Sequence, residues 1–273
     1  MAKPPPRMAG FSVHLEGPVA ILAYDRPQSG NSLHFTVLQG LLDAMKWASE
    51  TPAVRVIVQT GTGRFFTTGM DLDDGSDAVD NDKIIQIFRE INETLITCKK
   101  VLIAAVNGPA VGYGTTSLGL YDLVYSVEGA YFFTPFGKLA SCPEGCSSIT
   151  FPSIMGHQKA MALLLAGERM SAQELCDAGL ITKIIPASTN EAFMSSVLEV
   201  AKRIADYPPV ALTASKSLIQ ENRMEELLRA NIKECEGLRV RLSHQEMKMA
   251  QVAFAKEQER KKQIKQDTRN SKL

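Results

Sequence analysis

Glu144 is the one acidic residue between Gly129 and Gly167. It lies in the run Ser-Cys-Pro-Glu-Gly-Cys-Ser-Ser at residues 141–148, among aromatic and aliphatic residues. Apolar surroundings disfavour the ionised carboxyl group and raise its pKa toward neutrality, where it can accept and return a proton. The pattern therefore indicates a tuned base. The alternative is an idle, exposed Glu144 in an ordinary Pro-Glu-Gly turn.

Two loops upstream, at residues 65–72 and 107–114, each follow a run that predicts a buried strand. Their glycines let the backbone turn so that a peptide N–H can face a ligand. Two such donors on one oxygen form an oxyanion hole, and a helix beginning near Gly114 would add its positive end. Either loop by itself is equally consistent with a simple packing turn between a strand and a helix.

The elements that must position these residues alternate along the chain. Apolar runs predict strands at residues 11–15, 19–23, 54–58, 101–106, 123–127 and 181–185. Helical spacing is found at residues 35–48, 84–95 and 159–166. Ser171 with Glu174 forms a capping box that opens a helix closed by Gly179. This alternation predicts an α/β core.

Beyond residue 190 the pattern is helical almost throughout, with expected breaks at Pro208-Pro209 and Asn222-Arg223. We divide the chain into a flexible N-terminus at 1–10, a core at 11–205, a C-terminal helical oligomerisation region at 206–264 and a tail at 265–273. The apolar positions in that helical region fit one helix face, which either an oligomer contact or an intramolecular core explains: Leu227, Leu228, Ile232, Cys235 and Leu238.

The composition describes an ordinary protein with a sizeable core, since 45% of its 273 residues are hydrophobic. Thirty basic residues balance 30 acidic ones, so the net charge calls for neither nucleic acid nor an anionic membrane. Residues 256–273 hold seven basic and three acidic residues, which predicts a solvated helix end or, alternatively, a phosphate contact. No apolar run reaches membrane-spanning length.

The five cysteines are odd in number and scattered, which favours a reducing compartment over a disulfide framework. Cys142 and Cys146 have no histidine pair at metal-binding spacing, so we expect no metal. The four histidines lie in no motif and are expected to be structural or exposed: His14, His34, His157 and His244.

The two loops and Pro143-Glu144-Gly145, in this order, resemble the crotonase (enoyl-CoA hydratase/isomerase) superfamily. The resemblance covers roughly residues 11–208 and includes Arg26-Pro27, Asn31-Ser32-Leu33 and Ala178-Gly179-Leu180. Residues 142–148 and Phe151-Pro152 are most similar to the peroxisomal Δ3,Δ2-enoyl-CoA isomerases. The resemblance implies an α/β crotonase fold, in which repeated ββα units form a spiral core with a C-terminal helical region. It also implies a homotrimer or a hexamer.

The resemblance assigns Glu144 as the base and the N–H groups of Met70 and Tyr113 as donors to the thioester oxygen. Its substrate-binding residues correspond to Thr67, Thr68, Gly69, Met70, Asp71, Gly112, Phe136 and Arg26. Arg26 near the CoA nucleotide is alternatively a solvated loop charge, and we prefer a role for Asp71 in holding its loop. The implied substrate is an acyl-CoA thioester. No cofactor is expected, because CoA is part of the substrate.

The two glutamates that activate water in enoyl-CoA hydratases correspond to Thr116 and Phe136, neither of which can transfer a proton. We therefore expect an isomerase that moves a proton of 3-enoyl-CoA from C2 to C4. The rival hypotheses are another CoA-ester activity, such as hydration or thioester hydrolysis, and a non-catalytic CoA- or protein-binding domain.

The chain ends in Ser271-Lys272-Leu273, the tripeptide that a peroxisomal import receptor reads. We expect import into the peroxisomal matrix. The alternative is a basic terminus that matches the signal by chance.

Overall fold

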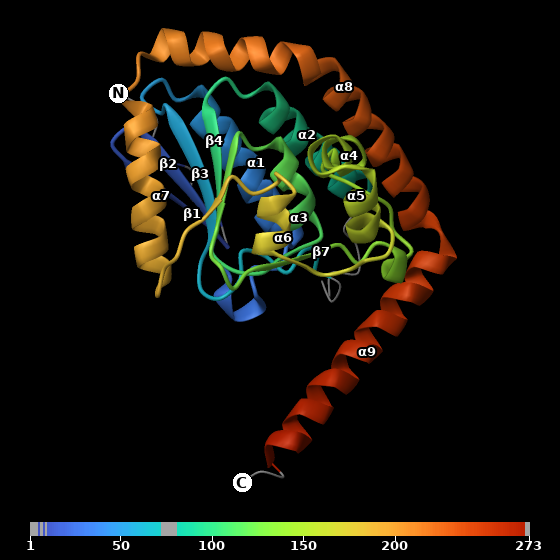
Figure 1. The fold of residues 1–273 in the computed structure, drawn as a ribbon. Helices are drawn as coiled ribbons and strands as arrows, with labels where there is room; N and C mark the ends of the chain where they lie inside the picture. Colours follow the sequence, from blue (N-terminus) through green and yellow to red (C-terminus); the bar gives the residue numbers. More distant parts are fainter. Residues whose placement is uncertain (1–4, 6–7, 9, 72–80, 271–273) are drawn as a thin grey trace.

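The computed structural model describes residues 5, 8, 10–71 and 81–270, without the side chains of residues 255, 258–259 and 261–270. Leu72 and the predicted targeting tripeptide Ser271-Lys272-Leu273 lie outside the described residues. Within them, strands and helices alternate as the sequence predicts (Figure 1).

The larger sheet has six strands in the order β1-β2-β3-β4-β6-β9. These are β1 (Phe11–Glu16), β2 (Val19–Tyr24), β3 (Val56–Gly61), β4 (Val101–Val106), β6 (Leu123–Ser126) and β9 (Lys183–Ile184). The first two strands form an antiparallel hairpin, and the remaining pairs are parallel. Every residue of β3 and β4 is buried, as expected for parallel strands covered on both faces.

A second sheet of three short strands has the order β5-β7-β8, with β5 (Ala110–Val111), β7 (Tyr131–Phe133) and β8 (Met170–Ser171). Each of β4 and β6 is followed by a strand of this smaller sheet and then by a helix. The helices are α3 (Tyr113–Thr116) and α4 (Ser147–Met155). This strand-strand-helix repeat is the ββα unit that the resemblance to the crotonase superfamily implies.

Helices cover the larger sheet on both faces (Figure 1). The main apolar core joins one face to α1 (Phe35–Glu50) and α2 (Asn81–Thr97), and a second core joins the other face to α7 (Asn190–Ala205). Successive β3 residues divide between them: Ile57 belongs to the first core, whereas Val56 and Val58 belong to the second. The period-two alternation of strand side chains produces this division.

The remaining helices are short connectors: η1 (Pro27–Ser29), η2 (Ser117–Leu120), η3 (Gly137–Leu139), α5 (His157–Leu164) and α6 (Ala172–Asp177). The predicted capping box is confirmed, because Ser171 Oγ accepts from the Glu174 amide and the Glu174 carboxylate accepts from the Ser171 amide. The helix predicted near Gly114 is a single α turn that continues as a 3-10 turn.

Two long helices complete the described chain, α8 (Pro209–Ser243) and α9 (Gln245–Asn270). Figure 1 shows α8 running over the top of the body and down beside α2 and α4, and α9 projecting beyond it. The predicted break at Asn222-Arg223 is wrong, since α8 is continuous there. The exposed Asn222 amide donates to the Leu218 carbonyl one turn back, so this residue is accommodated within the helix. The chain bends at His244 instead.

Most predicted boundaries shift by one to three residues, and the differences at β3, β9 and α9 are described here. β3 runs from 56 to 61 instead of 54 to 58, because its register with β2 extends to the pair Tyr24 and Gly61. The last predicted strand shortens to the two residues of β9. α9 continues to Asn270, across residue 265, where a tail without structure was expected. Its Lys, Arg, Gln and Glu residues are good helix formers.

Candidate active site

A cavity of about 360 Å³ lies between the two glycine loops, the loop at 141–148 and the C-terminal helices. Eight of the predicted site residues line it: Thr68, Gly69, Met70, Asp71, Gly112, Tyr113, Phe136 and Glu144. Apolar walls come from Ile84 and Phe88 of α2, from Leu238 and Leu242 of α8 and from Met247 and Phe254 of α9. Residues from distant parts of the sequence therefore share one enclosed space.

The two loops that hold the expected donors touch each other at their glycines. Gly69 has a φ of +82° and Gly112 a φ of +56°, backbone conformations that favour glycine. A Cβ at Gly69 would lie 2.9 Å from the Val111 carbonyl oxygen, and one at Gly112 would lie 3.8 Å from the Gly69 Cα. Met70 and Tyr113 each directly follow one of these touching glycines.

The amide of Met70 is left out of the local strand pairing. Leu33 donates to the Gly69 carbonyl at 2.8 Å and accepts from the Asp71 amide at 3.2 Å, which forms a parallel bridge around Met70. In such a bridge the central residue turns its own N–H away from the partner. Tyr113 is the first residue of α3, where the amides lack helical acceptors. Both peptide groups are thus suited to donate to a ligand.

The Tyr113 side chain is anchored on the side of α2 and α8. Its hydroxyl donates to Asn92 Oδ1 at 2.7 Å, and Asn92 Nδ2 donates to Asn231 Oδ1 at 2.9 Å. Asn231 in turn donates to the Arg89 carbonyl at 3.0 Å. All three polar side chains are buried, so this chain of bonds ties the second loop to both helices.

Glu144 lies at the start of a tight turn. Its carbonyl accepts from the amide and the hydroxyl of Ser147, while Gly145 and Cys146 have φ of +64° and +60°. Two successive left-handed residues are typical of a type I′ turn. This turn leads directly into α4 and leaves the Glu144 side chain on the cavity wall.

Burial raises the pKa of the Glu144 carboxyl to about 8, and the negative charge of Glu234 adds to the effect. By exposed area the Glu144 side chain is half-buried, because one side of it faces the cavity. No described residue forms a hydrogen bond or ion pair with that carboxylate. An unpaired acid with a pKa near neutrality suits proton transfer in both directions.

Three predicted residues support the loops. Thr67 is fully buried, and its hydroxyl donates to the Asn31 carbonyl and accepts from the Gly69 amide. Arg26 does not line the cavity but donates to the Ser32 carbonyl and lies 3.7 Å from the Asp71 carboxylate. Asp71 also accepts from Ser32 Oγ at 2.9 Å, which agrees with its expected role in holding the loop.

No second proton carrier stands beside Glu144 at the positions of the hydratase glutamates. The Thr116 hydroxyl lies near the carbonyls of Gly112 and Tyr113 in its own turn, and Phe136 packs on the cavity wall. Among the described lining residues the carboxylates are Glu144 and Asp71, and Asp71 is occupied by Ser32 and Arg26.

The described residues contain neither a cluster of potential metal ligands nor a helix able to span a membrane. In that part of the chain, no three His, Cys, Asp or Glu side chains are placed to hold an ion. None of its helices combines the length and apolar character needed to cross a bilayer.

A family model described as enoyl-CoA hydratase/isomerase matches residues 15–266. The chain belongs to this family. Enoyl-CoA delta isomerase 2 of Rattus norvegicus is 38% identical over 251 residues, which are 90% of this chain and 63% of the relative. The chain therefore spans about three fifths of that relative's length. Enoyl-CoA delta isomerase 3, peroxisomal, of Mus musculus is 34% identical over 85% of this chain and 73% of its own length.

The chain is also similar to a protein whose name describes no enzyme. The human chromodomain Y-like protein is 34% identical over 82% of this chain but only 38% of its own length. Among solved structures, an enoyl-CoA hydratase/isomerase from Pseudoalteromonas atlantica T6c has a TM-score of 0.83 and 29% identity, covering 91% of this chain and 97% of that chain. The predicted crotonase fold is confirmed.

The sequence pattern did not reveal the part of the candidate site that comes from the C-terminal helices. Glu234 of α8 lies behind the loop at 141–148, and α9 contributes Met247, Lys248, Gln251 and Phe254 to the cavity. One signal was present. Glu234 interrupts the apolar helix face at seven residues after Leu227 and four before Leu238, and a charge on such a face needs a partner. That face packs within the chain, as the intramolecular alternative expected, although Ile232 remains exposed.

Proposed function

We propose that this chain is a Δ3,Δ2-enoyl-CoA isomerase, which converts 3-enoyl-CoA into trans-2-enoyl-CoA during the β-oxidation of unsaturated fatty acids. The observation that carries the proposal is the single unpaired carboxylate, Glu144, in a cavity that it shares with Met70 and Tyr113. The isomerase names of the relatives described above support the same reaction.

The proposed reaction begins when the thioester oxygen accepts hydrogen bonds from the Met70 and Tyr113 amides. Glu144 removes a proton from C2, the C2–H electrons delocalise toward the carbonyl, and a dienolate forms. Negative charge grows on the oxygen, so donors already in place stabilise the transition state more than the bound substrate. Glu144 then returns the same proton to C4. The double bond moves from C3–C4 to C2–C3, and no atom is gained or lost.

The proposed substrate contacts follow the walls of the cavity. The pantetheine arm would lie along the backbone of the first loop, at Thr68 to Asp71, and the acyl chain along Phe136 and the apolar residues of α2, α8 and α9. Arg26 or a lysine of the C-terminal helices, such as Lys248, would meet the CoA phosphates. No cofactor takes part in this scheme, because CoA arrives with the substrate.

The decisive experiment is an isomerase assay with a panel of 3-enoyl-CoA chain lengths, in which conjugation of the double bond is followed. The expected result is turnover for at least one chain length by the parent protein and a large loss in Glu144→Gln. Hydration of 2-enoyl-CoA without action on 3-enoyl-CoA would instead identify a hydratase.

A non-catalytic binding domain is the second candidate, because the chain also resembles the chromodomain Y-like protein. The same assay separates the two. No turnover in either the parent protein or Glu144→Gln, together with tight binding of an acyl-CoA, would favour the binding domain.

The proposal extends to a homotrimer or a hexamer and to the peroxisomal matrix, through binding of Ser271-Lys272-Leu273 by the import receptor. The peroxisomal name of one relative supports this location. Sedimentation equilibrium of the purified protein tests the assembly, and a single-chain mass would contradict it.

A further inference from the structure

Helix α8 holds the start of α4 through one buried carboxylate. Glu234, only 8% exposed, accepts from the Cys146 amide at 2.7 Å with one oxygen and from the Ser148 amide at 2.9 Å with the other. The first amides of a helix have no acceptors within it, so Glu234 satisfies two groups that α4 leaves open. The positive end of α4 also favours an ionised carboxylate at this place.

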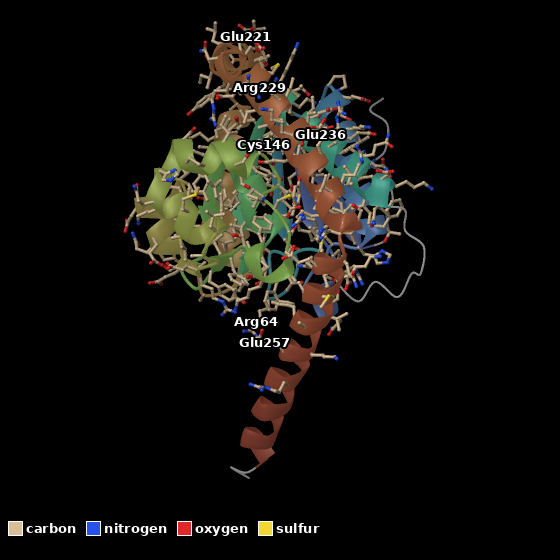
Figure 2. All side chains as sticks on the ribbon, turned by 90° about the vertical axis from the view of Figure 1, so that its right-hand side faces the viewer. Arg64, Cys146, Glu221, Arg229, Glu236 and Glu257 are labelled. Carbon is tan, nitrogen blue, oxygen red and sulfur yellow. The ribbon has the colours of Figure 1, made fainter. Side chains whose placement is uncertain are left out.

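The residue that Glu234 holds most closely is strained. Cys146 adopts a φ of +60° and a ψ of 15°, a left-handed conformation that costs free energy for any residue with a side chain. Such a conformation persists only where the surroundings enforce it. The Cys146 thiol also donates to the Leu227 carbonyl at 3.5 Å, so α8 contacts this residue through both its amide and its side chain. Figure 2 shows Cys146 beside α8, the helix on which Arg229 and Glu236 are labelled.

We propose, on the basis of the proposed isomerase function, that Glu234 is a positioning residue that fixes the place of Glu144 and adds its own negative charge to the surroundings of that carboxylate. Glu144 lies two residues before Cys146 and takes its direction from the turn that Glu234 fixes. One rigid carboxylate on α8 thereby aims a second carboxylate at the substrate.

The electrostatic part of this role follows from the burial of both acids. Burial disfavours the anion of each, and the pKa of Glu234 is raised by burial although its two N–H donors oppose that shift. Two neighbouring anions in a poorly solvated region repel each other, so one of them binds a proton more readily. Glu234 has its donors and Glu144 has none among the described residues, so the proton resides preferentially on Glu144.

The remaining titratable or charged groups near this pair come from every element packed around it. They belong to the loop at 141–148, to the first glycine loop and to helices α2, α3, α8 and α9. In chain order they are Asp71, Arg89, Glu93, Tyr113, Cys142, Cys146, Cys235, Arg241 and Lys248. Burial raises the pKa of the Cys142 and Cys235 thiols to about 11, so they stay neutral in the range where Glu144 titrates.

The test compares Glu234→Gln with Glu236→Gln, its matched control. Both substitutions remove one negative charge from α8, but Glu236 is exposed. We expect Glu234→Gln to lower kcat on the order of tenfold through loss of positioning. It should also move the acid limb of the kcat profile toward lower pH by roughly one unit, because the repelling charge is gone. Glu236→Gln should match the parent protein in both measurements.

Glu234→Asp separates the two parts and serves if the glutamine variant does not fold. It keeps the charge but is one methylene shorter, so it cannot reach both amides. We expect a lower kcat with an unmoved acid limb. Parent-like kcat and pH profile in Glu234→Gln, or parent-like kcat in Glu234→Asp, would overturn the proposal.

An infrared titration keeps this test independent of the isomerase assignment. The protonated carboxyl band that disappears in Glu144→Gln reports the charge state of Glu144 without turnover. A band that titrates at lower pH in Glu234→Gln than in the parent protein supports the proposal even if 3-enoyl-CoA is not a substrate. An identical titration in both proteins would contradict it.

Discussion

At the scale of single residues, the proposed reaction depends on Glu144, whose carboxyl group is costly to ionise. Replacing Glu144 by Gln keeps the size of the side chain but removes its proton transfer. We expect kcat to fall by about 10²- to 10⁴-fold, the usual contribution of a general base. Binding of a saturated acyl-CoA, measured by calorimetry, should change little, which would exclude a folding defect. A variant with parent activity would remove Glu144 from the mechanism.

The raised pKa also predicts how the rate depends on pH. In the proposed reaction only ionised Glu144 can remove the first proton, and burial raises its pKa to about 8. We expect kcat/KM to rise with pH and to level off above about 8. A profile that is already flat from pH 6 upward would show that Glu144 is solvated, as in the idle-turn alternative.

The same residue should lower stability in alkaline solution. The folded protein holds the Glu144 proton up to pH of about 8, whereas the unfolded chain releases it near 4.5. Between these values the folded state binds more protons, so the free energy of unfolding falls as pH rises. Glu144→Gln should therefore be more stable than the parent by up to a few kcal/mol at pH 9. Equal urea midpoints of the two proteins at pH 9 would contradict this.

At the scale of elements, the contact between the two glycine loops is the most sensitive point. Gly69→Ala would place a Cβ 2.9 Å from the Val111 carbonyl oxygen, at a φ of +82°. Because neither backbone can yield without moving a donor, we expect a loss of kcat of about 10²-fold, the lower end of the range for losing one oxyanion donor. Gly129→Ala is the control, since nothing lies within 4 Å of its added Cβ. Steady-state kinetics of both variants decide the matter.

The attachment of α8 to the sheet includes an ion pair between a buried lysine and an exposed aspartate. Lys216, 7% exposed, lies 2.6 Å from Asp122, which also accepts from the Leu102 amide of β4. Lys216→Met removes this charged hydrogen bond, and because Asp122 stays in contact with water the free energy of unfolding should fall by only about 2 kcal/mol. The exposed pair of Lys202 and Glu16 supplies the control, because Lys202→Met should cost less than 1 kcal/mol. Urea unfolding of both variants measures the difference.

The local sequence pattern predicted those strands and helices that a single physical rule determines. The buried strand at 101–106 and the capping box at Ser171 follow from apolar runs and from side-chain chemistry, and both are confirmed. The glycines and the isolated acid marked the two loops and Glu144 in the sequence, whereas the individual donors Met70 and Tyr113 were assigned by the resemblance to the crotonase superfamily. Glu234 and the α9 wall were missed, since their roles arise only after residues more than 80 positions apart pack together.

At the scale of the whole molecule, we predict delivery to peroxisomes through Ser271-Lys272-Leu273. A fluorescent protein fused ahead of residue 1 should collect in peroxisomes, and deletion of the tripeptide should leave the fusion in the cytosol. Imaging beside a peroxisomal marker makes the comparison. The same distribution with and without the tripeptide would contradict the prediction.

The cavity wall supplied by α9 also has a consequence for the order in which the protein is made. Residues 70, 113 and 144 leave the ribosome well before residues 247–254. A nascent chain therefore contains the proposed reacting groups before α9 completes the wall of the cavity. Because α9 carries none of the proposed reacting groups, selection can change the shape of this wall, and with it the acyl chains that the proposed enzyme accepts, while the proposed proton transfer stays unchanged.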